Sequence, residues 1–203
     1  MDERHLFVPK DLAALVGSRL CHDLTSPIGA IGNGLELLGM TGIAQTPEMS
    51  LIADAVHDAN ARIRFFRLAF GAASNEHHVP AREITEILEA LYSKSRLKIN
   101  WLPDYDLTRL DTKLGFLMIN CAESALPMGG TVTMALTDGR WRLTAQGARL
   151  NIDPLVWQSL EDPMASPDLR PAHVQFALLH QEAERHGRSL RYRAEDTTLE
   201  MTG

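Results

Sequence analysis

The sequence predicts an α-helical domain followed by an α+β domain: a helical hairpin that pairs with a second copy into a four-helix bundle, and then an α/β sandwich. Three observations support this fold class. Apolar residues recur with helical spacing on two long segments, a small polar stretch follows at residues 71–80, and helical and alternating patterns mix after it. We therefore expect two domains, residues 1–75 and residues 76–203.

The first predicted helix runs from Pro9 to Met40, and its only internal helix breaker is Pro27, which should kink the helix without ending it. At ~100° per residue its apolar residues share a stripe about 80° wide, which is typical of an amphipathic helix. This stripe consists of Leu20, Leu24, Ile28, Ile31, Leu35 and Leu38.

A second long helix should begin at Thr46 and Pro47, with Thr46 as its cap and Pro47 in its first turn. Its apolar stripe consists of Ile52, Val56, Ala59, Ile63, Phe66 and Phe70. Two long helices joined by a short turn form an antiparallel hairpin, but one hairpin cannot enclose its own apolar stripes. We therefore expect a homodimer through residues 9–74, whose second copy completes the four-helix bundle.

The second predicted domain mixes helices and strands. The patterns predict helices over residues 81–93, 110–126 and 171–186, and strands over residues 97–101, 131–137, 140–144, 190–193 and 198–201. Asp138-Gly139 predicts a hairpin turn, and the proline-rich segment 150–170 should hold one short helix at residues 155–160. These elements predict a sheet with helices on one face.

The composition argues against several classes of protein. With 45% hydrophobic and 23% charged residues the chain is typical of soluble globular proteins, and no apolar run approaches the ~20 residues that cross a bilayer. The acidic start lacks a signal-peptide pattern, and the formal charge of −6 argues against nucleic acid as a partner. Cys21 and Cys121 lack the paired spacing of a metal site. We expect a cytoplasmic protein that binds no membrane and no metal.

His22 lies about 200° from Leu20 around the first helix, so it points away from the apolar stripe and toward solvent. Nearby small or polar residues leave the imidazole accessible to another protein, and the candidates for such contacts are Arg19, Thr25, Gly29 and Asn33. The alternative interpretation is that His22 is a surface histidine with no functional role. The residues that follow His22 favour a functional role.

The string Cys21-His22-Asp23-Leu24-Thr25-Ser26-Pro27 resembles the phosphoacceptor box of bacterial sensor histidine kinases: His, an acidic residue, an apolar residue, two variable positions and Pro. The resemblance implies that His22 carries a phosphoryl group and that Asp23 orients the ring and accepts its proton. Ser26, at i+4, shares the face of His22 and could bond the ring or the phosphoryl group. That family often has Thr or Asn at this position, so a phosphatase activity stays open.

The second domain resembles, in order, the ATP-binding domain of the same kinases, a Bergerat-type sandwich. Residues 117–124 and 129–132 are similar to its asparagine box and following strand, and residues 183–190 to its last helix-to-strand turn. However, Ala145-Gln146-Gly147 stands where an Asp-x-Gly-x-Gly box binds adenine, and His173-Val174-Gln175-Phe176 where a glycine box binds phosphates. We expect a degenerate ATPase-like domain without a nucleotide site, with Asn120 as a structural remnant.

A complete phosphoacceptor helix beside an eroded nucleotide site resembles the ChpT family of histidine phosphotransferases. The resemblance implies a phosphorelay in which His22 carries the phosphoryl group between receiver-domain aspartates of a hybrid histidine kinase and of response regulators, including a CtrA-type cell-cycle regulator. It implies no cofactor in this chain, with Mg²⁺ only in the partner receiver domain. An ATP-dependent sensor histidine kinase and a noncatalytic kinase-like adaptor are the alternatives.

Three residues of the second predicted helix, Arg62, Phe65 and Arg67, are further candidates for contact with a docking receiver domain. Outward residues of a helix are often only solvated, and the sequence leaves that alternative open.

Overall fold

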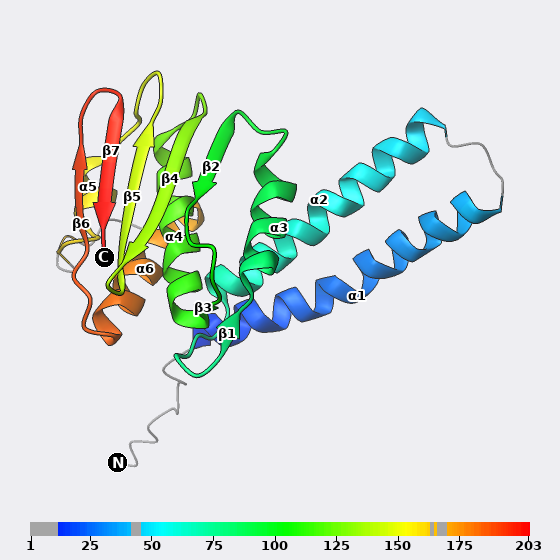
Figure 1. Cartoon of the computed structure of the whole chain (residues 1–203), viewed down its shortest axis with the longest axis horizontal. Helices are drawn as coiled ribbons and strands as arrows, with labels where there is room; N and C mark the ends of the chain where they lie inside the picture. Colours follow the sequence, from blue (N-terminus) through cyan, green and yellow to red (C-terminus); the bar gives the residue numbers. More distant parts are fainter. Residues whose placement is uncertain (1–11, 42–45, 163–164, 166–169) are drawn as a thin grey trace, which may run out of the picture. The chain divides into compact units, whose positions relative to one another are not determined.

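The computed structural model describes residues 12–41, 46–162, 165 and 170–203. The chain divides into two compact units, Met1–Ala72 and Ala73–Gly203. The first unit holds two long helices and the second holds a mixed sheet with shorter helices (Figure 1). The mixed helical and sheet architecture expected from the sequence is therefore confirmed.

The first unit is a hairpin of helix α1, Leu12–Met40, and helix α2, Pro47–Phe70. Thr46 caps α2 as predicted, because its hydroxyl accepts a hydrogen bond from the Met49 amide at 3.3 Å and proline occupies the first turn. Residues 9–11, expected to begin the first helix, lie outside the described residues. The helices approach closely at Gly17, where an added Cβ would lie 3.1 Å from the carbonyl oxygen of Phe70.

The apolar stripe of α1 divides between two surroundings. Ile28 and Leu35 are half-buried, but four other members of the stripe are exposed. These are Leu20 (57% exposed), Leu24 (51%), Ile31 (48%) and Leu38 (44%). At ~100° per residue these four side chains lie within about 40° of one another, and we call them the exposed α1 row. Packing inside the hairpin therefore covers only part of the predicted stripe.

The second unit is built on a five-stranded sheet with the strand order β2-β4-β5-β7-β6. Only the β2–β4 pair is parallel, and the other three pairs are antiparallel. The strands are β2 (Leu97–Trp101), β4 (Gly130–Thr137), β5 (Arg140–Gln146), β6 (Arg191–Ala194) and β7 (Thr198–Thr202). All five match strands predicted from the sequence.

The turn between β4 and β5 has the predicted chemistry. Asp138 and Gly139 have φ angles of 50° and 71°. Both lie in the left-handed region that a two-residue type I′ turn requires, which is why Asp-Gly is favoured there. This turn sets the register that pairs Thr137 with Arg140.

A second, two-stranded sheet was not predicted. It pairs β1, His78–Val79, antiparallel with β3, Leu107–Thr108. Both residues of β1 fall in the small polar stretch at residues 71–80, and strands of two residues are too short to show an alternating pattern.

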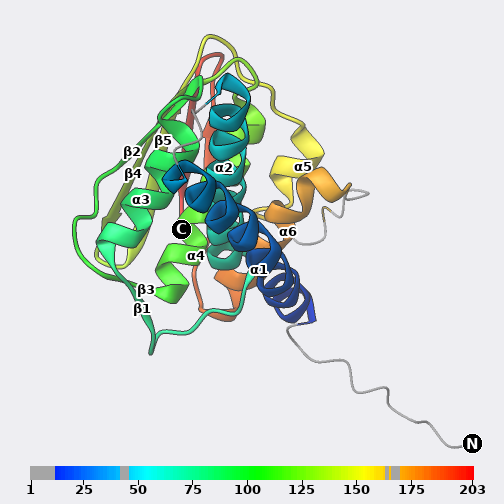
Figure 2. The ribbon, with the colours of Figure 1, turned by 90° about the vertical axis from the view of Figure 1, so that its right-hand side faces the viewer.

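Helices cover one face of the five-stranded sheet, as Figure 2 shows from the side. They are α3 (Ala81–Tyr92), α4 (Arg109–Ala125), α5 (Pro154–Gln158) and α6 (Val174–Arg185), the last preceded by a 3₁₀ turn, Pro171–His173. Helix α4 is buried on nearly every side, because 12 of its 17 residues are inaccessible to solvent. It is the central element of this core.

Gly115 lets two tryptophan rings approach α4. A Cβ at this position would lie 2.8 Å from Trp101 and 2.9 Å from Trp141. The two rings are themselves 4.8 Å apart, and Phe116 meets Trp101 edge-on at 5.8 Å. The missing side chain at Gly115 is therefore what allows this aromatic cluster to form.

Across the described ranges, no helix combines the length and the apolar character needed to cross a membrane. In the same ranges, no group of three or more His, Cys, Asp and Glu side chains is arranged to hold a metal ion.

Candidate functional site

His22 projects from the N-terminal half of α1, and its side chain is 83% exposed. This exposure agrees with its position opposite the apolar stripe. An α-helix holds the backbone rigidly, so the imidazole is presented on a stiff support rather than on a loop. The expectation that the ring faces solvent is confirmed.

Asp23 holds the His22 ring from one side. The Nδ1 atom of His22 lies 3.1 Å from Oδ1 of Asp23. A carboxylate can only accept, so Nδ1 is the donor and the neutral ring carries its proton there. The Nε2 atom then keeps a free lone pair, which is the form that a nucleophile toward phosphorus needs.

Arg19 holds the other oxygen of the same carboxylate. Its Nε donates to Oδ2 of Asp23 at 2.7 Å, across one turn of the helix. The hydrogen bond from His22 and then that from Arg19 lower the pKa of Asp23 below its ordinary value of 3.8. The carboxylate therefore stays ionised through the physiological pH range.

Four further predicted site residues follow on the same helix. Thr25 donates its hydroxyl to the Cys21 carbonyl oxygen at 2.7 Å, so this group is engaged within the helix. Ser26 and Asn33 are exposed, and Gly29 is half-buried, with no atom within 4 Å of where its Cβ would be. In the described part of the chain, Ser26 makes no hydrogen bond to His22, so its expected role stays a prediction.

The three candidate residues of α2 differ in accessibility. Arg62 and Arg67 are exposed, whereas Phe65 is only 2% exposed. Phe65 was expected on an outward docking surface, and that expectation is wrong because its ring is buried. Arg67 lies close enough to Cys21 to offset part of the rise in the pKa of that thiol, which burial causes. Arg67 therefore lies near the residue that precedes His22.

The segment that follows β5 is closely packed against neighbouring residues. The resemblance to kinases places an adenine-binding box in this segment. An added Cβ at Gly147 would lie 2.4 Å from a methyl carbon of Leu126 and 3.0 Å from the carbonyl oxygen of Gly129. The amide of Asn151 donates to the carbonyl oxygen of Ala125 at 2.9 Å. The chain after β5 is therefore packed against the end of α4.

Aromatic packing occupies the segment where those kinases have a phosphate-binding glycine box. Phe176 is fully buried and meets Trp157 edge-on at 5.1 Å, and Trp157 is itself only 1% exposed. The ring of His173 also meets the Phe176 ring edge-on, with 6.3 Å between the ring centroids. A glycine box works by bringing bare backbone amides to phosphate oxygens, and bulky rings prevent that approach.

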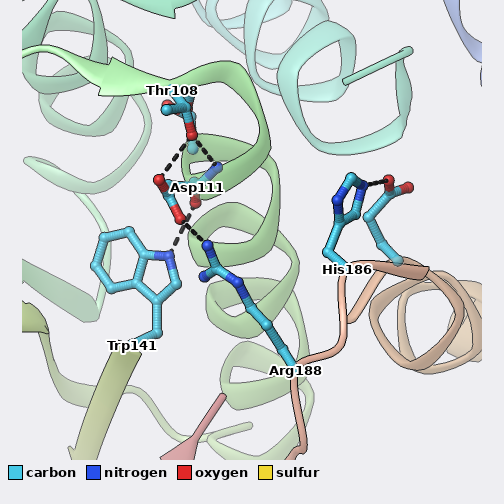
Figure 3. A network of polar contacts seen from close by, with 7 residues as sticks. Thr108, Asp111, Trp141, His186 and Arg188 are labelled. Atoms are coloured by element: carbon cyan, nitrogen blue, oxygen red, sulfur yellow. Dashed lines mark hydrogen bonds and ion pairs between the residues drawn. The ribbon is translucent and has the colours of Figure 1, made fainter. Parts of the chain in front are cut away.

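The second unit also contains a polar network that was not predicted (Figure 3). Asp111 accepts from Thr108 at 2.7 Å and from Arg188 at 2.5 Å, and its backbone carbonyl accepts from the Trp141 indole at 2.9 Å. These contacts join the start of α4 to β5 and to the turn after α6. Arg188 is 77 residues from Asp111, so no local pattern could reveal the pair.

A buried ion pair joins α4 to α6. Lys113 donates from Nζ to Oε2 of Glu182 at 2.6 Å, with side chains 3% and 9% exposed. His186 lies 3.4 Å from the other oxygen of Glu182. Charged groups this deeply buried are stable only when paired, so the contact fixes how the two helices pack.

The comparison with known families decides the identity. The family model described as the histidine phosphotransferase C-terminal domain matches residues 81–198. The chain belongs to the histidine phosphotransferase family. The prediction of a phosphorelay phosphotransferase is confirmed by this match and by the curated relative described next.

This histidine phosphotransferase is 32% identical over 184 residues to the protein phosphotransferase ChpT of Brucella abortus (strain 2308), covering 85% of this chain and 87% of that protein. Among solved structures, it is similar to a bacterial phosphotransferase determined at 1.7 Å. That match has 28% identity and a TM-score of 0.66, and it covers 96% of each chain.

One feature of the site in this phosphotransferase was not predicted from the sequence. Arg19 was expected to touch a partner, and its bond to Asp23 was not foreseen. The spacing of four residues between an arginine and an aspartate on one helix is the signal that could have revealed it.

Proposed function

We propose that His22 is the phosphoacceptor of this phosphotransferase and that Nε2 is the attacking atom. The observation that carries the proposal is the exposed ring whose Nδ1 is bonded to Asp23 at 3.1 Å. An accessible imidazole with one nitrogen fixed as a donor has its other nitrogen free to attack.

The proposed partners are receiver domains that carry an aspartyl phosphate. In the transfer step, the Nε2 lone pair forms a bond to phosphorus while the bond between phosphorus and the partner's carboxylate oxygen breaks. The carboxylate leaves with the bonding electrons, and Nδ1 keeps its proton, shared with Asp23. In this chain, His22 and Asp23 hold the attacking nitrogen in position and stabilise the developing charge. Positioning and electrostatic stabilisation dominate the catalysis of phosphoryl transfer.

Magnesium has no role in this chain under the proposal, because it would be held by the receiver domain. From the resemblance to the ChpT family, we further propose that phosphate arrives from a hybrid histidine kinase and leaves to response regulators, including a CtrA-type cell-cycle regulator, in the cytoplasm. Candidate contacts for the receiver domain around His22 are Thr25, Gly29, Asn33, Arg62 and Arg67.

The proposal includes a homodimer in which two hairpins form a four-helix bundle. The exposed α1 row supports it, because covering four large apolar side chains aligned on one helix with a second surface stabilises the association. Each such side chain contributes about 1.5–3 kcal/mol when it passes from full exposure to full burial. A side chain that is already half-buried contributes only a fraction of that stabilisation.

The proposal treats the second unit as a degenerate ATPase-like domain that binds no nucleotide. The packing of Leu126 against Gly147 and of Phe176 against Trp157 supports this assignment. We expect millimolar ATP to leave the melting temperature unchanged, because a ligand without affinity for the folded state adds no stability. A saturable rise in melting temperature would favour the ATP-dependent kinase instead.

A transfer assay tests the role of His22. The protein and its His22→Ala variant are each incubated with a receiver domain labelled on its aspartate with ³²P. Label should pass to the unmodified protein and not to the variant. Transfer to both proteins, or to neither, would reject the proposal, and binding of the receiver without transfer would favour the adaptor.

A further inference from the structure

We propose that Arg19 is a positioning residue for phosphoryl transfer: it holds the Asp23 carboxylate so that the second oxygen meets Nδ1 of His22. This inference rests on the proposed role of His22 as phosphoacceptor. It changes the interpretation of Arg19, which the sequence suggested as a contact for a partner protein.

The geometry of the three side chains carries the inference. Adjacent residues on a helix do not face each other, so Asp23 has to turn sideways to reach His22. Arg19 lies one turn before Asp23 and bonds Oδ2 at 2.7 Å, while Oδ1 lies 3.1 Å from the ring nitrogen. One carboxylate thus bridges the guanidinium and the imidazole.

The His22 ring depends on this bridge because little else holds it. Its side chain is 83% exposed, and within the described residues Asp23 supplies the one hydrogen bond that the ring makes. If Asp23 turned away, the ring would rotate freely and its proton could move to Nε2. That tautomer has no lone pair on Nε2 to attack phosphorus.

The same bridge matters as the reaction proceeds. When Nε2 bonds to phosphorus, the ring gains positive charge while Nδ1 keeps its proton. An ionised carboxylate beside Nδ1 stabilises that charge, and the contacts with His22 and Arg19 lower the pKa of Asp23, which keeps it ionised. No proton needs to leave the pair during transfer.

The effect of Arg19 should be geometric rather than on folding stability. Its side chain is 76% exposed, and ion pairs at such sites contribute little to stability. Its Nε–H is a directed donor in the plane of the guanidinium, whereas a lysine ammonium is a point charge without that direction. Lysine at this position should therefore restore the function only in part.

Two phosphoryl donors separate positioning from docking. Phosphoramidate is a small molecule without a docking surface, and it phosphorylates an imidazole nitrogen with release of ammonia. A phosphorylated receiver domain also needs a protein interface. If Arg19 positions the ring, its loss slows both reactions; if it docks the receiver, only the second reaction suffers.

The test compares the unmodified protein with Arg19→Gln and Arg19→Lys. We expect Arg19→Gln to lower the rate constant for phosphorylation of His22 by about tenfold with either donor, a fraction of the ~10⁴ that a wrong imidazole tautomer costs a serine protease. The receiver concentration at half-maximal rate should not change, and Arg19→Lys should lie between. Long-range ¹H–¹⁵N spectra should show the ring proton moving from Nδ1 toward Nε2 in Arg19→Gln.

Arg82→Gln is the matched control. Arg82 bonds Glu86 through Nε at 2.8 Å with the same spacing of four residues, on an exposed face of α3 in the second unit. This variant should react at the unmodified rate. Circular dichroism checks that all variants fold.

The outcomes distinguish this inference from the proposed function. Equal rates for the unmodified protein and Arg19→Gln would overturn the inference alone. A higher half-maximal receiver concentration in Arg19→Gln, with an unchanged phosphoramidate rate, would overturn it in favour of docking. Failure of both donors to phosphorylate His22 in the unmodified protein would overturn the proposed function itself.

Discussion

The two units treat apolar surface in opposite ways. In the second unit, Phe116, Trp141 and Phe176 are almost fully buried around α4 and the sheet. In the first unit, the exposed α1 row leaves four large apolar side chains about half in water. A core that closes on itself needs nothing further, whereas an amphipathic hairpin with an open apolar face is suited to covering by another surface.

Ion pairs show the same contrast. Lys113 and Glu182 are buried and join two helices of the core, with exposures of 3% and 9%. Arg19 and Asp23 are 76% and 48% exposed and lie beside His22. The same kind of ion pair thus joins two buried helices in one unit and lies beside an accessible reactive group in the other.

The largest expected effect is on the buried pair. Lys113→Met should destabilise the second unit by about 3–5 kcal/mol, because it leaves the buried carboxylate of Glu182 without its 2.6 Å partner. Urea denaturation followed by circular dichroism measures the change in the free energy of unfolding. The double variant Lys113→Met with Glu182→Leu should recover most of the loss, since it removes both charges. A double variant as unstable as the single one would show that packing, not charge, is at fault.

A charge in the exposed α1 row should break the proposed dimer. Ile31→Glu would place an unpaired carboxylate in the covered surface and weaken association by at least about 100-fold. The neighbouring substitution Ala30→Glu lies about 100° away around the helix and should leave association intact. Light scattering at micromolar concentration reports the mass. A single-chain mass for the unmodified protein would contradict the dimer. A dimeric mass for Ile31→Glu would show that the exposed α1 row lies outside the interface.

The smallest expected effect concerns the two cysteines, one in each unit. Complete burial raises the pKa of the Cys121 thiol well above its ordinary value of 9.0. Burial also raises the pKa of Cys21, and the nearby charge of Arg67 offsets part of that rise. At pH 8 we expect iodoacetamide to alkylate Cys21 at least about ten times faster, since the hairpin opens more readily than a closed core. Mass spectrometry of peptides measures both rates, and equal rates would mean that the units open together.

The buried Cys121 thiol also makes the folding stability depend on pH. The pKa of Cys121 is higher in the folded chain than in the unfolded chain, so its contribution to stability is complete below about pH 9.0. As the pH rises above that value the unfolded thiol ionises and the contribution is lost. Cys121→Ala should therefore flatten the fall in stability above pH 9.0.

Much of the fold could be predicted because its signals are local. Thr46 before Pro47 marks a helix start, and Asp138-Gly139 marks a tight turn, through the chemistry of two or three consecutive residues. The unpredicted β1 and β3 have two residues each and pair across some 30 positions of sequence. The contact of Lys113 with Glu182 spans 69 positions, so only the folded chain could reveal it.

The site shows the same division. The exposure of His22 followed from helical periodicity, because one angle around the helix decides which residues face outward. Phe65 was misplaced, since an outward angle on a single helix says nothing of what else packs over it. The bridge from Arg19 through Asp23 depends on side-chain rotamers, which periodicity does not determine.

The aromatic cluster around Gly115 has a spectroscopic consequence. All three tryptophans and all three tyrosines of the chain lie after residue 72, and the hairpin contains only phenylalanine among the aromatic residues. Ultraviolet absorbance at 280 nm and intrinsic emission thus report on the sheet and its helices alone. Melting of the hairpin would be nearly silent in fluorescence but visible in helical ellipticity, to which α3, α4 and α6 of the second unit also contribute. A loss of ellipticity without a change in emission would therefore report on the hairpin without any added label.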